Sequence, residues 1–183
     1  KGTVTAESTG ALESFDYQFA AKLAQVINFS ALADKTFGDA DYTLSATASS
    51  GLPIIFSSSN STVVSVSGSN ATVNNAGETL IYASQAGDAT YAPVSLEQHQ
   101  LVNKAAATVN LSNLTQEYTG SGIQASVSTV PADLTLKVTY DGSVTLPVDL
   151  GSYAVAADIE EPNYSGNATG TLLINDVTAP VPD

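Results

Sequence analysis

Apolar and polar residues alternate in short runs along this chain, and turn sequences separate the runs. Phe15, Tyr17 and Phe19, for example, fall on one face of an extended segment, as a half-buried strand requires. No stretch keeps the 3.6-residue apolar period of an amphipathic helix for long. The pattern predicts an all-β chain with strands at residues 2–8, 13–20, 26–30, 42–48, 53–58, 63–67, 71–74, 79–86, 94–102, 107–112, 123–130, 134–140, 151–159 and 167–175.

One unit of this pattern occurs twice in tandem. The segment 21–29 returns 82 positions later as 103–111, and Tyr91 and Tyr164 stand at matching places before the last strand of each unit. Such a long-period echo indicates an array of similar modules. We therefore expect the terminal hairpin of a preceding repeat at 1–24, complete units at 25–102 and 103–175, and a Pro-rich linker at 176–183.

Short strands at this spacing, with no helix between them, are typical of antiparallel β-sandwiches. Residues 25–102, by their sequences at 51–60 and 83–88, resemble bacterial immunoglobulin-like repeats. Residues 103–175 resemble the MBG, or YDG-type, repeats of bacterial surface proteins, by their sequences at 118–120, 138–143, 151–155 and 162–166. The resemblance implies tandem immunoglobulin-like antiparallel β-sandwiches in a large extracellular, often adhesin-like, protein. It supplies no catalytic residue.

Charge and composition narrow the possible partners. The formal net charge is −13, and Lys and Arg together number five, so no basic face is available for nucleic acid or for an anionic membrane. No apolar run approaches the length of a transmembrane helix, which argues against membrane insertion. The absence of Cys excludes disulfides and thiol chemistry. High acidity without Cys suits an extracellular array that does not self-associate, and it equally suits an organism adapted to salt.

Candidate catalytic groups are sparse. His99 is the single imidazole, and its parity with Glu97 places it on the solvent side of a strand. A nucleophile–His–acid arrangement has no supporting motif here. The carboxylate pairs at 39/41 and 160/161 lack the Trp, Arg or His that shape a sugar-cleaving site. The sequence therefore predicts that the chain is not an enzyme.

Calcium is the one cofactor that the sequence leaves open. The ion takes six to eight hard oxygen ligands from loops and needs neither Cys nor His. The candidate ligands are Asp39, Asp41, Asp158, Glu160 and Glu161. An Asp-x-Asp pair alone lacks the Gly and the distal Glu of an EF-hand loop. Solvated acidic loops are the alternative interpretation.

Two functions from different classes remain. The first is a structural spacer, or stalk segment, whose partners are neighbouring repeats of the same polypeptide and whose short junctions at Lys22 and Lys104 limit bending. The alternative is a non-catalytic module, in an adhesin or beside a secreted enzyme, that binds a glycan or protein of a host or matrix. It would need an exposed apolar patch, which Phe15, Tyr17 and Phe19 could supply. Repetition of Tyr91 and Tyr164 favours a shared packing role for both.

Overall fold

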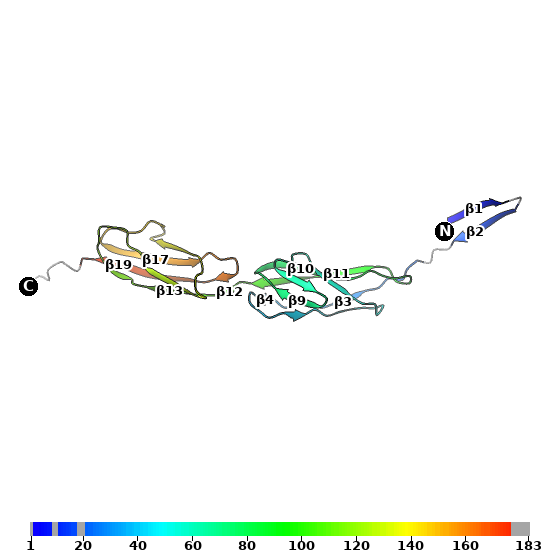
Figure 1. The fold of residues 1–183 in the computed structure, drawn as a ribbon, viewed down its shortest axis with the longest axis horizontal. Coiled ribbons are helices and arrows are strands. Elements are labelled where there is room, and N and C mark those ends of the chain that lie inside the picture. Colours follow the sequence, from blue (N-terminus) through cyan, green and yellow to red (C-terminus); the bar gives the residue numbers. More distant parts are fainter. Residues whose placement is uncertain (1, 9–10, 18–20, 177–183) are drawn as a thin grey trace, which may run out of the picture.

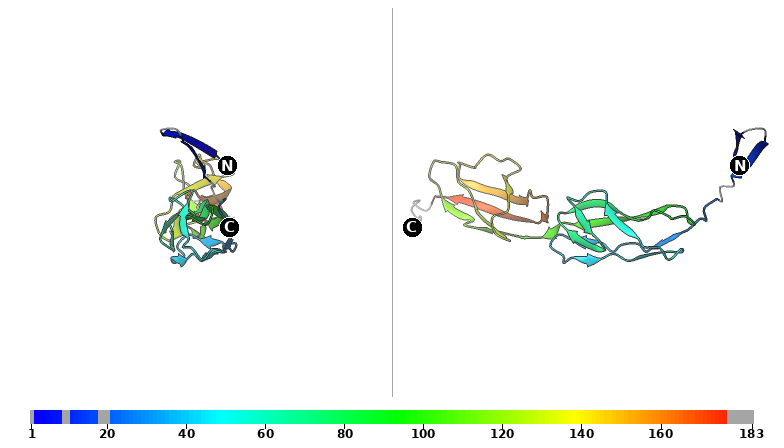
Figure 2. Two further views of the ribbon diagram at one scale, coloured as in Figure 1. Left: turned by 90° about the vertical axis from the view of Figure 1, so that its right-hand side faces the viewer. Right: turned by 45° about the vertical axis from the view of Figure 1, so that its right-hand side comes forward.

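A computed structural model describes residues 2–8, 11–17 and 21–176 (Figure 1). Every regular element in these residues is a β-strand, and they contain no helix long and apolar enough to cross a membrane. The strands form a hairpin and two β-sandwiches that follow one another along an elongated molecule (Figures 1 and 2). The all-β fold predicted from the alternation is therefore confirmed.

The hairpin consists of β1 (Gly2–Ser8) and β2 (Ala11–Tyr17), which pair antiparallel from Gly2 opposite Tyr17 to Ser8 opposite Ala11. Phe19 lies outside the described residues, as do the side chains of Phe15 and Tyr17. The aromatic patch predicted from these three residues therefore stays a prediction. The Pro-rich linker beyond Asp176 also lies outside the described part of the chain.

The first sandwich has two facing layers. One is the four-stranded sheet β4-β11-β10-β7, and the other combines the pair β3-β6 with the three-stranded sheet β5-β9-β8. The bounds are β3 (Ile27–Phe29), β4 (Lys35–Thr36), β5 (Tyr42–Thr43), β6 (Ala46–Ala48), β7 (Ile55–Ser58), β8 (Val64–Ser67), β9 (Asn70–Val73), β10 (Gly77–Gln85) and β11 (Val94–Asn103).

Alternation along the central strands builds the core of the first sandwich. On β10, Ile81 and Ala83 are fully buried, because they face inward at a two-residue period. Val64 and Ala71, from the hairpin β8–β9, are also fully buried and cover the same core. Phe29 packs on Phe56, with ring centroids 5.7 Å apart. The hairpin β8–β9 is thus an integral part of this core.

The second sandwich repeats the architecture with fewer strands. Its four-stranded sheet is β14-β19-β17-β16, and the facing layer is the single pair β13-β15. The short strands β12 and β18 pair beside them. The bounds are β12 (Ala105–Ala106), β13 (Thr108–Ser112), β14 (Thr115–Glu117), β15 (Ser126–Val130), β16 (Leu136–Tyr140), β17 (Gly151–Ile159), β18 (Tyr164–Ser165) and β19 (Asn167–Asn175).

The core of the second sandwich is more strictly apolar than the first. Leu172, Ile174 and Val155 are at most 1% exposed and occupy its centre. The hydroxyl oxygen of the buried Tyr140 accepts the backbone N–H of Ala125 at 2.9 Å. The core is therefore small and consists of apolar side chains together with one tyrosine whose hydroxyl is hydrogen-bonded.

A buried glutamine distinguishes the first core. Gln100 on β11 is fully buried, at the position that Leu172 occupies on β19. Its amide donates to the carbonyl oxygens of Ala33 and Leu101, both at 2.9 Å, and accepts the Tyr42 hydroxyl at 2.8 Å. A buried amide is tolerated only when it is bonded in this way. Burial raises the pKa of the Tyr42 hydroxyl above its ordinary value.

Three short strand pairs are parallel, whereas the sequence predicts antiparallel sheets. These are β4 with β11, β12 with β18, and β14 with β19. In each pair, a segment of two or three residues joins the end of a long strand or a loop through its backbone. Such pairs require no alternation of side chains, so the apolar pattern carries no signal for them.

Candidate functional site at the junction of the two sandwiches

The two sandwiches are joined by a single residue. Strand β11 of the first sandwich ends at Asn103, and β12 of the second begins at Ala105, so that only Lys104 lies between them. The chain runs through the junction in an extended conformation (Figure 2). A connection of this length keeps the adjoining ends of the two sandwiches close together.

Backbone bonds fix the start of the second sandwich. The N–H groups of Ala105 and Ala107 donate to the carbonyl oxygens of Asn163 and Ser165, both at 2.9 Å. The Lys104 ammonium donates to the carbonyl oxygen of Glu161 at 2.8 Å. The segment after Lys104 is therefore held against the loop and short strand that contain Tyr164.

The same arrangement occurs at the start of the first sandwich. Leu23 forms a parallel bridge with Tyr91, and its N–H donates to the carbonyl oxygen of Thr90 at 2.8 Å. Leu23 and Tyr91 match Ala105 and Tyr164, which form the first residue pair of β12 and β18. The repeated tyrosines thus mark the place where each sandwich receives its incoming chain, in agreement with a shared packing role.

Asn163 connects the second sandwich to the first through its side chain. Its amide nitrogen donates to the side-chain oxygen of Asn75 at 2.9 Å, and its amide oxygen accepts the backbone N–H of Ala76 at 2.8 Å. Asn75 and Ala76 precede β10, on a loop at the end of the first sandwich. One side chain therefore spans the junction with two hydrogen bonds.

An aromatic pair forms a further contact across the junction. The rings of Phe37 and Tyr164 meet edge to face, with centroids 5.4 Å apart and an interplanar angle of 81°. Phe37 follows β4, and its N–H donates to the carbonyl oxygen of Asn103 at 2.9 Å. This bond places the ring at the end of the first sandwich, next to the exit of β11.

These contacts join the sandwiches at separate places: the covalent link at Lys104, the Asn163 bonds and the Phe37–Tyr164 pair. A hydrogen bond or an aromatic pair each contributes about 0.5–1.5 kcal/mol. The one-residue link keeps the groups at high effective concentration, so little further entropy is lost when they meet. None of the side-chain contacts pairs two charges, so salt should screen them little.

Two carboxylates, one in the loop before each repeated tyrosine, accept backbone N–H groups. The Asp88 carboxylate accepts the N–H groups of Tyr91 and Thr90, both at 2.7 Å, and these bonds hold its pKa below the ordinary value. Glu161, at the corresponding place in the second sandwich, accepts the Thr135 N–H at 2.9 Å, and bonding to Thr135 likewise lowers its pKa. Both side chains order the loops that precede the repeated tyrosines.

The candidate calcium ligands lie apart or are bonded to protein groups. Asp39 accepts the Thr36 N–H at 2.9 Å, and Asp41 accepts the side chains of Asn70 and Thr72 at 2.9 and 3.0 Å. Asp158 and Glu160 are exposed at the end of β17. Among the residues that the structure describes, no three His, Cys, Asp or Glu side chains gather into a group able to hold a metal ion.

Calcium binding therefore stays a prediction of the sequence, and we expect its effect to be small. Because Asp39, Asp41 and Glu161 already accept hydrogen bonds, an ion would compete with protein donors for their oxygens. The unfolding temperature of the whole chain should differ by less than about 1 °C between buffers with calcium and with chelator. A specifically bound ion would raise this temperature much more when its free concentration is about 100 times its dissociation constant. A shift of several degrees would contradict this expectation.

Sequence reasoning located part of the junction and missed the rest. Lys104 and Tyr164 were recognised because they recur with the repeat. Asn163 and Phe37 were not, because a single Asn in a turn and a single Phe after a short strand carry no periodic signal. His99 is half-exposed and lies 3.5 Å from Glu78 on the neighbouring strand, on the solvent side as its parity predicts.

Comparison with known protein families gives a match for the second sandwich. The family model of the MBG domain matches residues 107–178. The resemblance to repeats of large bacterial surface proteins is therefore confirmed, and it rests on this part of the chain. No curated protein matches the sequence.

Among solved structures, the crystal structure of Drosophila N-cadherin EC1-4 is similar at 12% sequence identity and a TM-score of 0.36. The match covers 85% of this chain and 50% of that one, so the present chain spans about half the length of the cadherin structure.

Proposed function

We propose that this chain is a spacer segment of a large extracellular bacterial surface protein of the adhesin type, and that it acts by holding its sandwiches in a fixed end-to-end orientation. The match of residues 107–178 to the MBG domain supports the bacterial surface location. The contact of Asn163 and Tyr164 with the first sandwich is the observation that carries the mechanical part. The chain performs no catalysis in this proposal.

The physical requirements of a spacer agree with the properties of the chain. Each sandwich has its own apolar core, so each can fold without its neighbour's core residues. The net charge of −13 keeps neighbouring copies apart by mutual repulsion. The junction is the part that decides between a stiff rod and a flexible chain, because only there do the two folded bodies meet.

The double variant Phe37→Ala/Asn163→Ala should make the junction flexible. It removes both the aromatic pair and the two Asn163 hydrogen bonds, and it leaves only the Lys104 connection. We expect small-angle scattering to show a shorter mean end-to-end length and a broader distribution than in the wild-type chain. The unfolding temperatures of the sandwiches should change little, because neither side chain belongs to a core.

A matched control is the variant Tyr118→Ala/Asn110→Ala. The N–H of Tyr118 donates to the carbonyl oxygen of Asn175, just as that of Phe37 donates to Asn103, so Tyr118 is the equivalent ring on the second sandwich. Asn110 is an exposed asparagine on β13. The control should scatter like the wild type. If the junction variant also scatters like the wild type, these contacts do not set the orientation.

A further inference from the structure

The end at which the chain leaves the second sandwich repeats the corresponding end of the first. Phe37 follows β4, and its N–H donates to the carbonyl oxygen of Asn103, the last residue of β11. Tyr118 follows β14, and its N–H donates to the carbonyl oxygen of Asn175, the last residue of β19. Both bonds are 2.9 Å long. The Tyr118 ring therefore stands beside the end of β19, where Phe37 stands beside the end of β11.

The other side of the exiting strand is equivalent as well. Strand β10 begins at Gly77 and β17 begins at Gly151, and each glycine pairs with the second-last residue of the exiting strand. Residues 149–150, which precede Gly151, therefore correspond to residues 75–76. In the first sandwich, residues 75–76 bind the side chain of Asn163 from the second.

The loop that contains residues 149–150 is held at two points. The Ile123 N–H donates to the carbonyl oxygen of the buried Pro147 at 2.9 Å. The Tyr153 hydroxyl donates to the carbonyl oxygen of Asp149, also at 2.9 Å. A loop fixed in this way loses little conformational entropy when another molecule contacts it.

This end of the second sandwich exposes an aromatic and two aliphatic side chains. Tyr118 is 45% exposed, Val148 is 41% exposed and Leu150 is 53% exposed. We call these three residues, together with Asp149, the exit surface. On the first sandwich, by contrast, the ring that corresponds to Tyr118 is packed against Tyr164 and is only partly exposed.

The polar groups of the exit surface fit an asparagine side chain. In the first junction, the amide oxygen of Asn163 accepts the Ala76 N–H, and its amide nitrogen donates to the side-chain oxygen of Asn75. The Leu150 N–H corresponds to that of Ala76, and the Asp149 carboxylate corresponds to the Asn75 oxygen. A carboxylate only accepts hydrogen bonds, so it can receive an amide N–H but repels a second carboxylate.

We propose that the exit surface docks the entry loop of a further sandwich of this class, one with Asn and an aromatic residue at the places of Asn163 and Tyr164. The asparagine bonds to Asp149 and to the Leu150 N–H, and the aromatic ring packs on Tyr118. A sandwich with an acid in place of the asparagine is rejected. The inference rests on the proposed spacer function, because it extends the same kind of junction to a third module.

An extended chain tests the proposal. Residues 1–175 are followed directly by a second copy of residues 104–183, so that the lysine of the copy takes the place of Asp176. Spin labels at Glu97→Cys and Thr169→Cys report on the first junction. In a second sample, labels at Thr169→Cys in the second sandwich and in the copy report on the new junction. We expect a narrow distance distribution in both samples.

Variants of the extended chain separate the contacts. Asn163→Asp in the copy alone should abolish the narrow distribution at the new junction and leave the first junction unchanged. Adding Asp149→Lys in the second sandwich should restore it, because the lysine pairs with the introduced acid. Tyr118→Ala in the second sandwich should broaden the new distribution. Val130→Ala, an exposed apolar position at the opposite end of this sandwich, is the control and should change neither distribution.

The outcomes distinguish this inference from the spacer function. A narrow distribution at the first junction with a broad one at the new junction would overturn the inference alone, whereas broad distributions at both would overturn both. A narrow new distribution that survives Asn163→Asp in the copy would also overturn the inference. In the unextended chain, removal of residues 177–183 should leave the amide shifts of Tyr118 and Leu150 unchanged. A change there would make this tail the occupant of the exit surface and overturn the inference.

Discussion

Leu172→Ala should lower the free energy of unfolding of the second sandwich by about 2–5 kcal/mol, since it removes a fully buried side chain from the centre of a small core. For a domain of this size, the loss corresponds to a decrease in Tm of about 10 °C or more. Differential scanning calorimetry should show that one transition moves and that a second, assigned to the first sandwich, stays in place.

Ile81→Ala is the matched control in the first sandwich. Ile81 is also fully buried and lies on the central strand β10. This substitution should move the other transition and leave the one affected by Leu172→Ala unchanged. If both transitions moved together in either variant, the sandwiches would be one cooperative unit, and independent cores would be the wrong description.

Gly166→Ala should produce the second large effect. A Cβ at this position would lie 2.1 Å from the carbonyl oxygen of Ala107 and 3.1 Å from Ile159, so the backbone must move. The segment at risk is the one that enters the second sandwich, where Ala107 donates to Ser165. Overpacking of this kind costs about 1–3 kcal/mol. We expect a lower Tm for the second sandwich and faster amide exchange at Ala105 and Ala107.

Ser165→Ala controls for a change in the same short strand. Ser165 is exposed, and its backbone oxygen, not its side chain, accepts the Ala107 N–H. The variant should therefore unfold like the wild type. Equal stability of the Gly166→Ala variant would mean that the entering segment relaxes without cost and that its pairing with β18 is unimportant.

The long strands were predictable because each buries one face. The predicted strand at 94–102 corresponds to β11 (Val94–Asn103), and that at 151–159 to β17 (Gly151–Ile159). In both, inward residues recur every second position, and Val102 and Val155 are buried accordingly. The sequence alone reveals this pattern, because shifting the register of the strand by one residue would turn its apolar side chains outward.

The functional features were less predictable because they depend on contacts between distant segments. Asn163 bonds to a loop that lies 88 positions earlier in the chain. Nothing in its local sequence distinguishes it from other turn asparagines. The buried Gln100 is similar, since its position alternates correctly but its partners, Ala33 and Tyr42, are known only once the sheets are packed.

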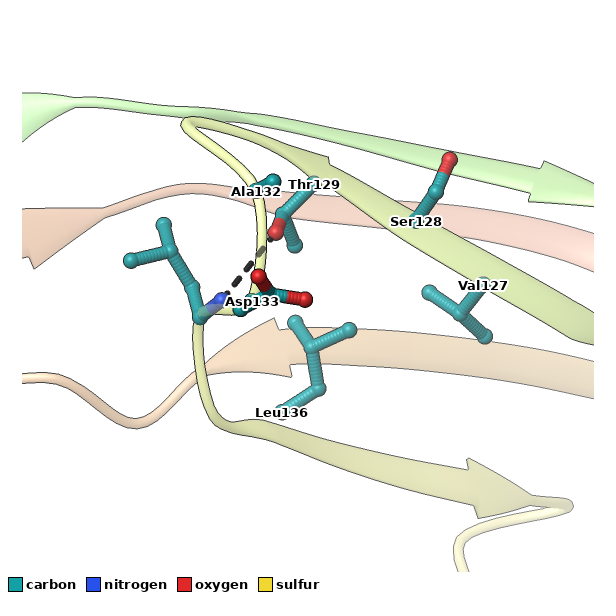
Figure 3. Close-up of a pocket in the computed structure, with 7 residues that line it drawn as sticks. Val127, Ser128, Thr129, Ala132, Asp133 and Leu136 are labelled. Atoms are coloured by element: carbon teal, nitrogen blue, oxygen red, sulfur yellow. Dashed lines mark hydrogen bonds between the residues drawn. The ribbon is translucent and has the colours of Figure 1, made fainter.

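The smaller number of strands in the second sandwich is visible in the sequence. The predicted strands at 63–67 and 71–74 have no counterpart in the second unit, where the turn at 140–143 leads toward the strand at 151–159. In the second sandwich the segment 141–150 takes the place of this hairpin, since the Ile123 N–H donates to the carbonyl oxygen of Pro147. The cavity between β15 and β16, lined by Val127 and Leu136 (Figure 3), could be recognised only in the three-dimensional structure.

The most direct test of the spacer account is the distance distribution between one spin label on each sandwich of the wild-type chain. The chain has no Cys, so Glu97→Cys on β11 and Thr169→Cys on β19, both exposed, can be labelled specifically. A rigid junction predicts one narrow distribution that stays unchanged from low to high salt, because the side-chain contacts across it are uncharged. A broad distribution at all salt concentrations would contradict the account, since the sandwiches would then move independently about Lys104.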